Sequence, residues 1–95
     1  MNMQQENLSA ICEIILASLA RLELDQDLTL ETVIYGNSSH LESIEIVTVL
    51  AEIEDEIDKS MLKVVDVFQI LLENQDVDVT VRALGLLILR SAHGL

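Results

Sequence analysis

The sequence predicts an all-α protein: a small four-helix bundle with a long loop between helices one and two and a short third helix. Three observations predict this class. The chain has 95 residues, of which 51% are apolar, enough for one core without disulfides or metals. The apolar residues are almost all aliphatic, with one Phe, one Tyr and no Trp. In long segments they recur every three or four residues, the spacing of one helix face. We therefore expect a single domain over residues 1–95.

The first helix is expected from about Gln4 to about Glu23. Its apolar stripe consists of Leu8, Ile11, Ile15, Leu19 and Leu22. The following segment, residues 24–42, has no sustained period and is rich in Asp, Thr, Asn, Ser and Gly. This composition predicts a long ordered loop, and loops of that length are often functional. The residues expected to pin it to the core are Leu28, Leu30, Ile34 and Tyr35.

The second helix is expected to begin within the serine-rich segment GNSSHLESIEI, residues 36–46. Its inward stripe consists of Ile46, Leu50, Ile53 and Ile57, with Val47 and Val49 beside it. A helical wheel places a second set on the outward side. These residues are Ile44, Thr48, Ala51, Glu52 and Asp55.

Two further helices follow after the short connection 59–65. Asp66 is a candidate N-cap for a brief helix through residue 74, although Val64, Val65 and Val67 leave a short strand as an alternative. After a turn over residues 74–79, Thr80 is a good N-cap for the last helix, which would end near Gly94. In that helix Val81, Leu84 and Ile88 are expected to face inward and Arg82 and Arg90 outward.

The charge distribution restricts the classes of partner. The formal net charge is -12, and eleven acidic residues but no Lys or Arg lie between Arg21 and Lys59. Such a surface repels nucleic acid and anionic membrane and attracts basic protein surfaces, while a merely solvated face remains the alternative. The longest apolar run, residues 83–89, is too short to cross a bilayer, and the N-terminus lacks the basic start of a signal peptide. With Cys12 as the single cysteine, expected to be a buried apolar residue, these features predict a cytoplasmic protein.

The sequence offers little for catalysis. His40 and His93 stand apart from any nucleophile with motif spacing. The acidic segment EIEDEID, residues 52–58, lacks the central Gly of a calcium loop, and most of its carboxylates would point outward. We therefore expect neither an enzyme nor a metal site.

Ser43 is the residue that stands out. A helix N-terminus tolerates an attached phosphate, because its free N–H groups and dipole face the anion. Residues 41–57, LESIEIVTVLAEIEDEI, resemble the acyl carrier and peptidyl carrier protein family, whose signature is Asp-Ser-Leu or Asp-Ser-Ile before a helix with an acidic end. LTLETVIYG (residues 28–36) resembles the family's loop between its first two helices, and TVRAL (residues 80–84) the opening of its last helix. The resemblance covers nearly the whole chain.

The resemblance implies that Ser43 carries 4'-phosphopantetheine, transferred from coenzyme A by a phosphopantetheinyl transferase, with Glu42 as its motif neighbour. The chain would then be a phosphoprotein that holds an acyl or aminoacyl group as a thioester, in fatty acid or specialised metabolite biosynthesis. Its further partners would be a loading ligase and synthase enzymes with basic docking surfaces, and it would act as a monomer. The expected partner face consists of Ile44, Glu45, Thr48, Ala51, Glu52 and Asp55.

Two alternatives accompany this interpretation. Glu42 stands where the family has Asp, and a register shifted by three residues would put His40 in the serine position. We reject that register because it places Glu54 at an apolar position. An unmodified acidic adaptor or dimerisation module is the alternative from another class, based on the apolar run ALGLLIL, residues 83–89. The sequence does not distinguish fatty acyl, aminoacyl and polyketide cargo.

Overall fold

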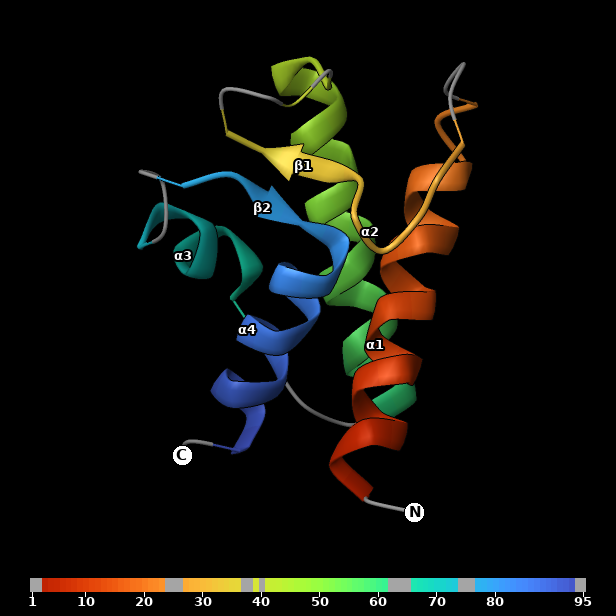
Figure 1. The fold of residues 1–95 in the computed structure, drawn as a ribbon, viewed down its shortest axis with the longest axis vertical. Coiled ribbons are helices and arrows are strands. Elements are labelled where there is room, and N and C mark those ends of the chain that lie inside the picture. Colours follow the sequence, from red (N-terminus) through yellow and green to blue (C-terminus); the bar gives the residue numbers. More distant parts are fainter. Residues whose placement is uncertain are drawn as a thin grey trace.

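Helices form most of the computed structural model, which describes residues 3–23, 27–36, 39, 41–61, 66–73 and 77–93. Among these residues the helices are α1 (Met3–Ala20), α2 (Ser43–Met61), α3 (Val67–Leu72) and α4 (Val81–His93). The strands are β1 (Val33–Tyr35) and β2 (Val79–Thr80). Helix α1 packs against both α2 and α4, and the short α3 contacts α2 and α4 (Figure 1). The predominance of helix is consistent with the expected all-α class, and a short two-stranded sheet accompanies the helices.

The core is aliphatic, as the composition predicts. The predicted stripes of α1, α2 and α4 supply most of its fully buried side chains, and Ile34 from β1 joins them at 0% exposure. Leu28, Leu30 and Tyr35 pack against this core partly buried, so the residues expected to pin the loop do so. Two residues of α2 depart from the simple stripe: Ile46 is half-buried and Val47 is exposed.

Helix α1 ends at Ala20, three residues before the expected end at Glu23. The N–H groups of Leu22 and Glu23 donate to the carbonyls of Leu19 and Ala20, at 3.0 and 3.1 Å, and close a tighter turn. Glu23 has a φ of 54°, in the left-handed region that glycine favours after a helix. The helical stripe continues through Leu22, so periodicity alone could not locate this end.

The sheet was not predicted and corrects the expectation of an unbroken loop before α2. Strands β1 and β2 pair antiparallel, with Val33 opposite Thr80 and Tyr35 opposite Val79. Next to the ladder, Val81 N–H donates to the Thr32 carbonyl at 3.0 Å and Arg82 N–H to the Leu30 carbonyl at 2.9 Å. The loop therefore satisfies two N–H groups at the start of α4 that a helix cannot pair internally.

The predicted helix starts are confirmed at both later helices. The Asp66 carboxylate accepts from Gln69 N–H at 3.0 Å at the start of α3, and the Thr80 hydroxyl accepts from Ala83 N–H at 3.1 Å in α4. Val67 is helical, so a strand is wrong at that residue, while Val64 and Val65 lie outside the described residues, as does Gly94. Helix α3 ends at Leu72, with Glu73 as its C-cap.

Cys12 is buried between α1 and α4, as expected of a small apolar residue. Burial raises the pKa of its thiol, and the charge of Arg82 opposes this only in part. Gly85 of α4 lies directly opposite, because a Cβ placed on it would be 2.7 Å from the Cys12 Sγ. The two helices thus approach closely where one of them has no side chain.

The apolar run of residues 83–89 is largely used by the chain's own core. Leu84, Gly85 and Ile88 are buried, and Ala83, Leu87 and Leu89 pack partly buried against the core. Leu86 is the member of the run that is exposed. In the part of the chain that the structure describes, no helix combines the length and apolar character needed to span a membrane.

Candidate functional site

Ser43 is the first residue of α2, and two glutamates cap the helix around it. Ile46 N–H donates to the Glu42 carbonyl at 3.0 Å, which places Glu42 at the N-cap. The N–H of Glu42 in turn donates to Oε1 of Glu45 at 2.8 Å. This second bond is the half of a capping box in which the third helical residue reaches back to the cap.

The hydroxyl of Ser43 is consequently not used as a cap. Its side chain is exposed, and we find no hydrogen bond to it from any described residue. The first N–H groups of α2, including that of Ser43 itself, have no acceptor within the helix. Ser43 therefore presents a hydroxyl at the positive end of a helix, without a hydrogen bond to any of the described residues.

The neighbouring serines differ from Ser43. The Ser39 hydroxyl donates to the Ile34 carbonyl at 2.7 Å and accepts from Leu41 N–H at 3.2 Å. Ser39 thus holds the turn between β1 and α2, as expected of a turn residue. Ser38 and His40 lie outside the described residues.

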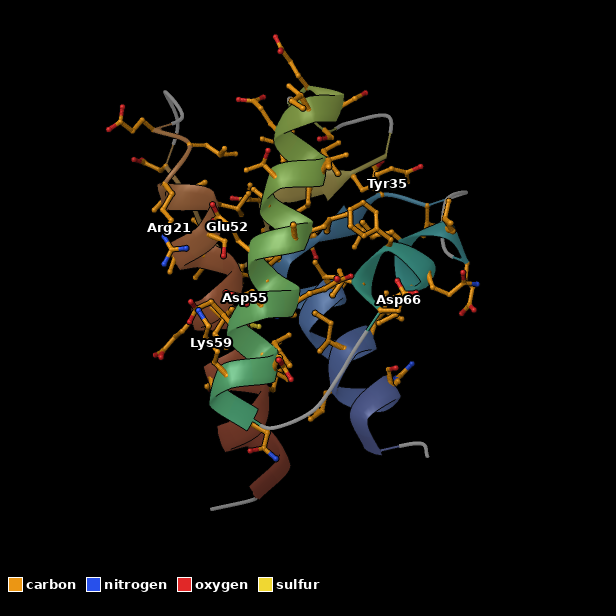
Figure 2. All side chains as sticks on the ribbon, turned by 180° about the vertical axis from the view of Figure 1, so that it is seen from behind. Arg21, Tyr35, Glu52, Asp55, Lys59 and Asp66 are labelled. Carbon is orange, nitrogen blue, oxygen red and sulfur yellow. The ribbon has the colours of Figure 1, made fainter. Side chains whose placement is uncertain are left out.

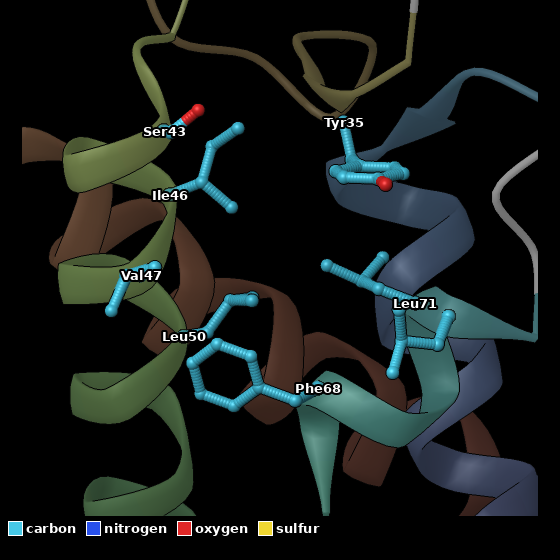
Figure 3. Close-up of a pocket in the computed structure, with 8 residues that line it drawn as sticks. Tyr35, Ser43, Ile46, Val47, Leu50, Phe68 and Leu71 are labelled. Carbon is cyan, nitrogen blue, oxygen red and sulfur yellow. The ribbon is translucent and has the colours of Figure 1, made fainter.

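A groove of about 210 Å³ opens beside Ser43, between α2, β1 and α3 (Figure 3). Its polar side chains are Ser43 and Tyr35, which lie at the same end of the groove. All its other lining residues are apolar, namely Ile46, Val47, Leu50, Phe68, Leu71 and Leu72. Such a surface suits a hydrocarbon chain or an apolar side chain.

Helix α3, which forms one wall of the groove, is attached to α2 by a carboxylate. Glu54 Oε1 accepts from Val67 N–H at 2.9 Å, at the first residue of α3. Together with the Asp66 cap, this bond satisfies two of the N–H groups that begin the helix. A helix of 6 residues needs such support, because one so short is unstable alone.

The residues expected to form a partner face lie along α2, and the carboxylates among them are engaged within the chain. Glu45 caps the helix, and Glu52 Oε2 lies 3.3 Å from Arg21 Nη1 of the turn after α1. Asp55 Oδ2 lies 2.9 Å from Lys59 Nζ one turn along α2, and this bond raises the pKa of Lys59 (Figure 2). These pairs are exposed and hence weak, so they reduce rather than abolish the negative potential of the face.

The remaining members of that face carry no charge. Ile44, Thr48 and Ala51 are exposed, and the Thr48 hydroxyl donates to the Ile44 carbonyl at 2.8 Å. Sequence reasoning did not find Arg21 as the partner of Glu52, nor Tyr35, Phe68 and Leu72 as groove residues. For Phe68 and Leu72 a signal existed, because their spacing of four places them on one side of a short helix.

No group of three or more His, Cys, Asp or Glu side chains that could hold a metal ion occurs among the described residues. The carboxylates of residues 52–58 thus do not converge on a common point. Comparison of the chain with models of known protein families, with curated proteins and with solved structures gives no match in any of the three. A functional assignment accordingly rests on the chain's own residues.

Proposed function

We propose that the chain is an acyl or aminoacyl carrier protein, a small four-helix bundle of acyl-carrier type with 4'-phosphopantetheine on Ser43. One observation carries this proposal: Ser43 is exposed at the first position of α2, beside an apolar groove, and its hydroxyl has no hydrogen bond from the residues that the structure describes. Formation of a phosphoester requires a hydroxyl that a transferase can reach. A serine used as an N-cap would first have to give up its bond to the backbone.

The start of α2 also suits the product of this modification. The phosphodiester carries a negative charge, and the helix dipole and unpaired N–H groups lie where that charge would be placed. The bond between Glu42 N–H and Glu45 keeps one of the nearby donors occupied, while the N–H groups of Ser43 and Ile44 stay directed at the helix entrance. Glu42, the motif neighbour, is exposed.

The division of labour in such a protein fits the absence of a catalytic constellation in the sequence. The cofactor supplies the thiol that holds the cargo, and the protein supplies the attachment point and a surface for partners. Those partners would be the transferase, a loading ligase and synthase enzymes with basic docking surfaces, attracted by the acidic α2. The groove would offer its mostly apolar walls to a hydrocarbon cargo.

The alternative, an unmodified acidic adaptor or dimerisation module, has less support. It rested on the apolar residues 83–89, most of which lie in or against the core of this chain. We therefore propose a monomeric carrier without catalytic activity of its own, acting in the cytoplasm.

Intact-mass measurement tests the proposal. We expect a pantetheinyl mass increment when the chain is coexpressed with a broad-specificity phosphopantetheinyl transferase. The Ser43→Ala variant should lack the increment, whereas Ser9→Ala, which removes an exposed serine of α1, should keep it. An unmodified wild-type chain, or an increment that persists in Ser43→Ala, would refute attachment at Ser43. The mass of the protein from its native host would then identify the cargo.

A further inference from the structure

A second hollow, remote from Ser43, lies between α1 and α2. Its volume is about 320 Å³, and we name it the α1–α2 cleft. The apolar part of its surface comes from α1 and consists of Ala10, Ile14 and Ala17. Its polar side chains are Glu13, Ser18 and Arg21 of α1 and Glu56 of α2. The rise of an α-helix puts Glu56 about 20 Å along the axis from Ser43, so the cleft is separate from the candidate site.

The hydroxyl of Ser18 is directed into this cleft. Ser18 is the polar residue that is buried among the described residues, with 1% of its surface exposed. We find no hydrogen bond between its hydroxyl and a described residue. Every described side-chain nitrogen or oxygen that is wholly enclosed has a partner, so the Ser18 hydroxyl must reach the open space of the cleft. A hydroxyl in such a place costs free energy unless a bound molecule supplies its hydrogen bond.

Two carboxylates at the cleft also lack an ionic partner among the described residues. Glu13 is exposed and Glu56 is half-buried, and neither forms an ion pair within that part of the chain. The cations near them are paired with other carboxylates, Arg21 with Glu52 at 3.3 Å and Lys59 with Asp55 at 2.9 Å (Figure 2). Glu13 and Glu56 are therefore left as charged acceptors beside the Ser18 hydroxyl.

These acceptors favour an ammonium group over other occupants. A primary ammonium has three N–H donors and no acceptor, and the cleft offers two carboxylates and one hydroxyl. An anion would meet the net charge of -12, with Arg21 already engaged by Glu52. A calcium ion takes six or more oxygen ligands, and no group of three His, Cys, Asp or Glu that could hold a metal occurs among the described residues.

We infer that the α1–α2 cleft binds a small primary alkylamine. Its ammonium group donates to Glu13, Glu56 and Ser18, and its carbon chain lies on the apolar surface of α1. The inference does not rest on the proposed cofactor, because every residue of the cleft is complete in the unmodified protein. A ligand that contacts both α1 and α2 also stabilises the packing of these two helices.

The test is a titration of the unmodified full chain with n-butylamine hydrochloride, followed through amide chemical shifts in NMR. We expect a Kd on the order of 1 mM, with the shift changes confined to residues 10–21 and to α2 around Glu56. Butyrate replaces the ammonium by a carboxylate, and tetramethylammonium keeps the charge but has no N–H donor. At equal ionic strength and pH, each should bind at least about tenfold more weakly than n-butylamine.

Matched variants locate the amine. Glu56→Gln should weaken n-butylamine about fivefold, because it removes a charge from the cleft, and Ser18→Ala about threefold, because it removes an acceptor. Asp27→Asn removes an exposed carboxylate and Ser9→Ala an exposed hydroxyl, both outside the cleft. These two controls should change the affinity less than about twofold.

Several results would overturn the inference. Equal binding of tetramethylammonium would mean that charge alone drives association, and tighter binding of butyrate would make Arg21 the binding group. Equal effects of Glu56→Gln and Asp27→Asn would place the site elsewhere. A lysine with both its backbone groups blocked that binds more tightly than n-butylamine would assign the cleft to the side chain of a partner protein. Absence of any shift change with n-butylamine would refute the site itself.

Discussion

The Glu45 carboxylate offers a test of how the start of α2 is built. Its Oε1 accepts from Glu42 N–H at 2.8 Å, and it is the acidic residue of the first turn. Glu45→Ala removes both the hydrogen bond and the charge, whereas Glu45→Gln keeps an oxygen acceptor and removes the charge alone. The pair of variants therefore separates the two contributions.

The expected magnitudes follow from this geometry. A capping hydrogen bond contributes about 1 kcal/mol, and a carboxylate near a helix N-terminus roughly 0.5 kcal/mol when partly exposed. Glu45→Ala should then lower the free energy of unfolding by about 1.5 kcal/mol and Glu45→Gln by about 0.5 kcal/mol. In a domain of this size, 1 kcal/mol corresponds to about 4–8 °C in Tm.

Urea unfolding followed by circular dichroism measures both variants. Glu13→Ala, at an exposed position of α1, is the control and should change stability by less than about 0.5 kcal/mol. Equal losses for Glu45→Gln and Glu45→Ala would refute the capping role. Both variants could also slow the modification of Ser43 equally, despite their different stabilities. That result would mean that the transferase recognises the charge of Glu45, as the sequence predicts for a partner residue.

Two further predictions concern the ends and contacts of α1. Gly85→Ala should destabilise the chain by about 1 kcal/mol, because a Cβ 2.7 Å from Cys12 Sγ overpacks the contact by more than the gain in helix propensity. Adding Cys12→Ala should recover most of this loss in urea unfolding, and a coupling near zero in the double-mutant cycle would contradict the contact. Glu23→Gly should stabilise by about 0.5 kcal/mol, because Glu23 has a φ of 54°. The same change at Glu13, inside α1, should destabilise by about 1 kcal/mol, and equal effects at the two sites would refute the role of the backbone angle.

The helices were predictable because their information is local. The stripes through Ile11, Ile15, Ile53 and Ile57 repeat at the helix period, and all four side chains are buried. The caps at Asp66 and Thr80 depend on residues next to each helix. The sheet could not be found in this way, because strands of 3 and 2 residues have no period to detect and their partners are distant in sequence.

In the candidate site, too, the features that depend on local sequence could be predicted, and those that depend on tertiary packing could not. Ser43 could be selected from its register with the stripe of α2. That the Glu45 carboxylate accepts from the Glu42 N–H beside it depends on a side-chain conformation, which sequence does not specify. The groove depends on where α3 docks, and the pairing of Arg21 with Glu52 on how α1 packs against α2. These contacts arise from tertiary packing, so the periodicity of the sequence could not predict them.

The pairing of β1 with β2 has a consequence for a chain that is still being synthesised. Tyr35, on one wall of the groove, is held by Val79, and β2 follows α2 and α3 in the sequence. Contacts between distant residues form late, because a long loop must close first. A nascent chain can therefore expose the Ser43 end of α2 before the groove beside it exists. An enzyme that recognises only the start of α2 can act on the growing chain. An enzyme that recognises the groove can act only after residues 79–80 have been synthesised.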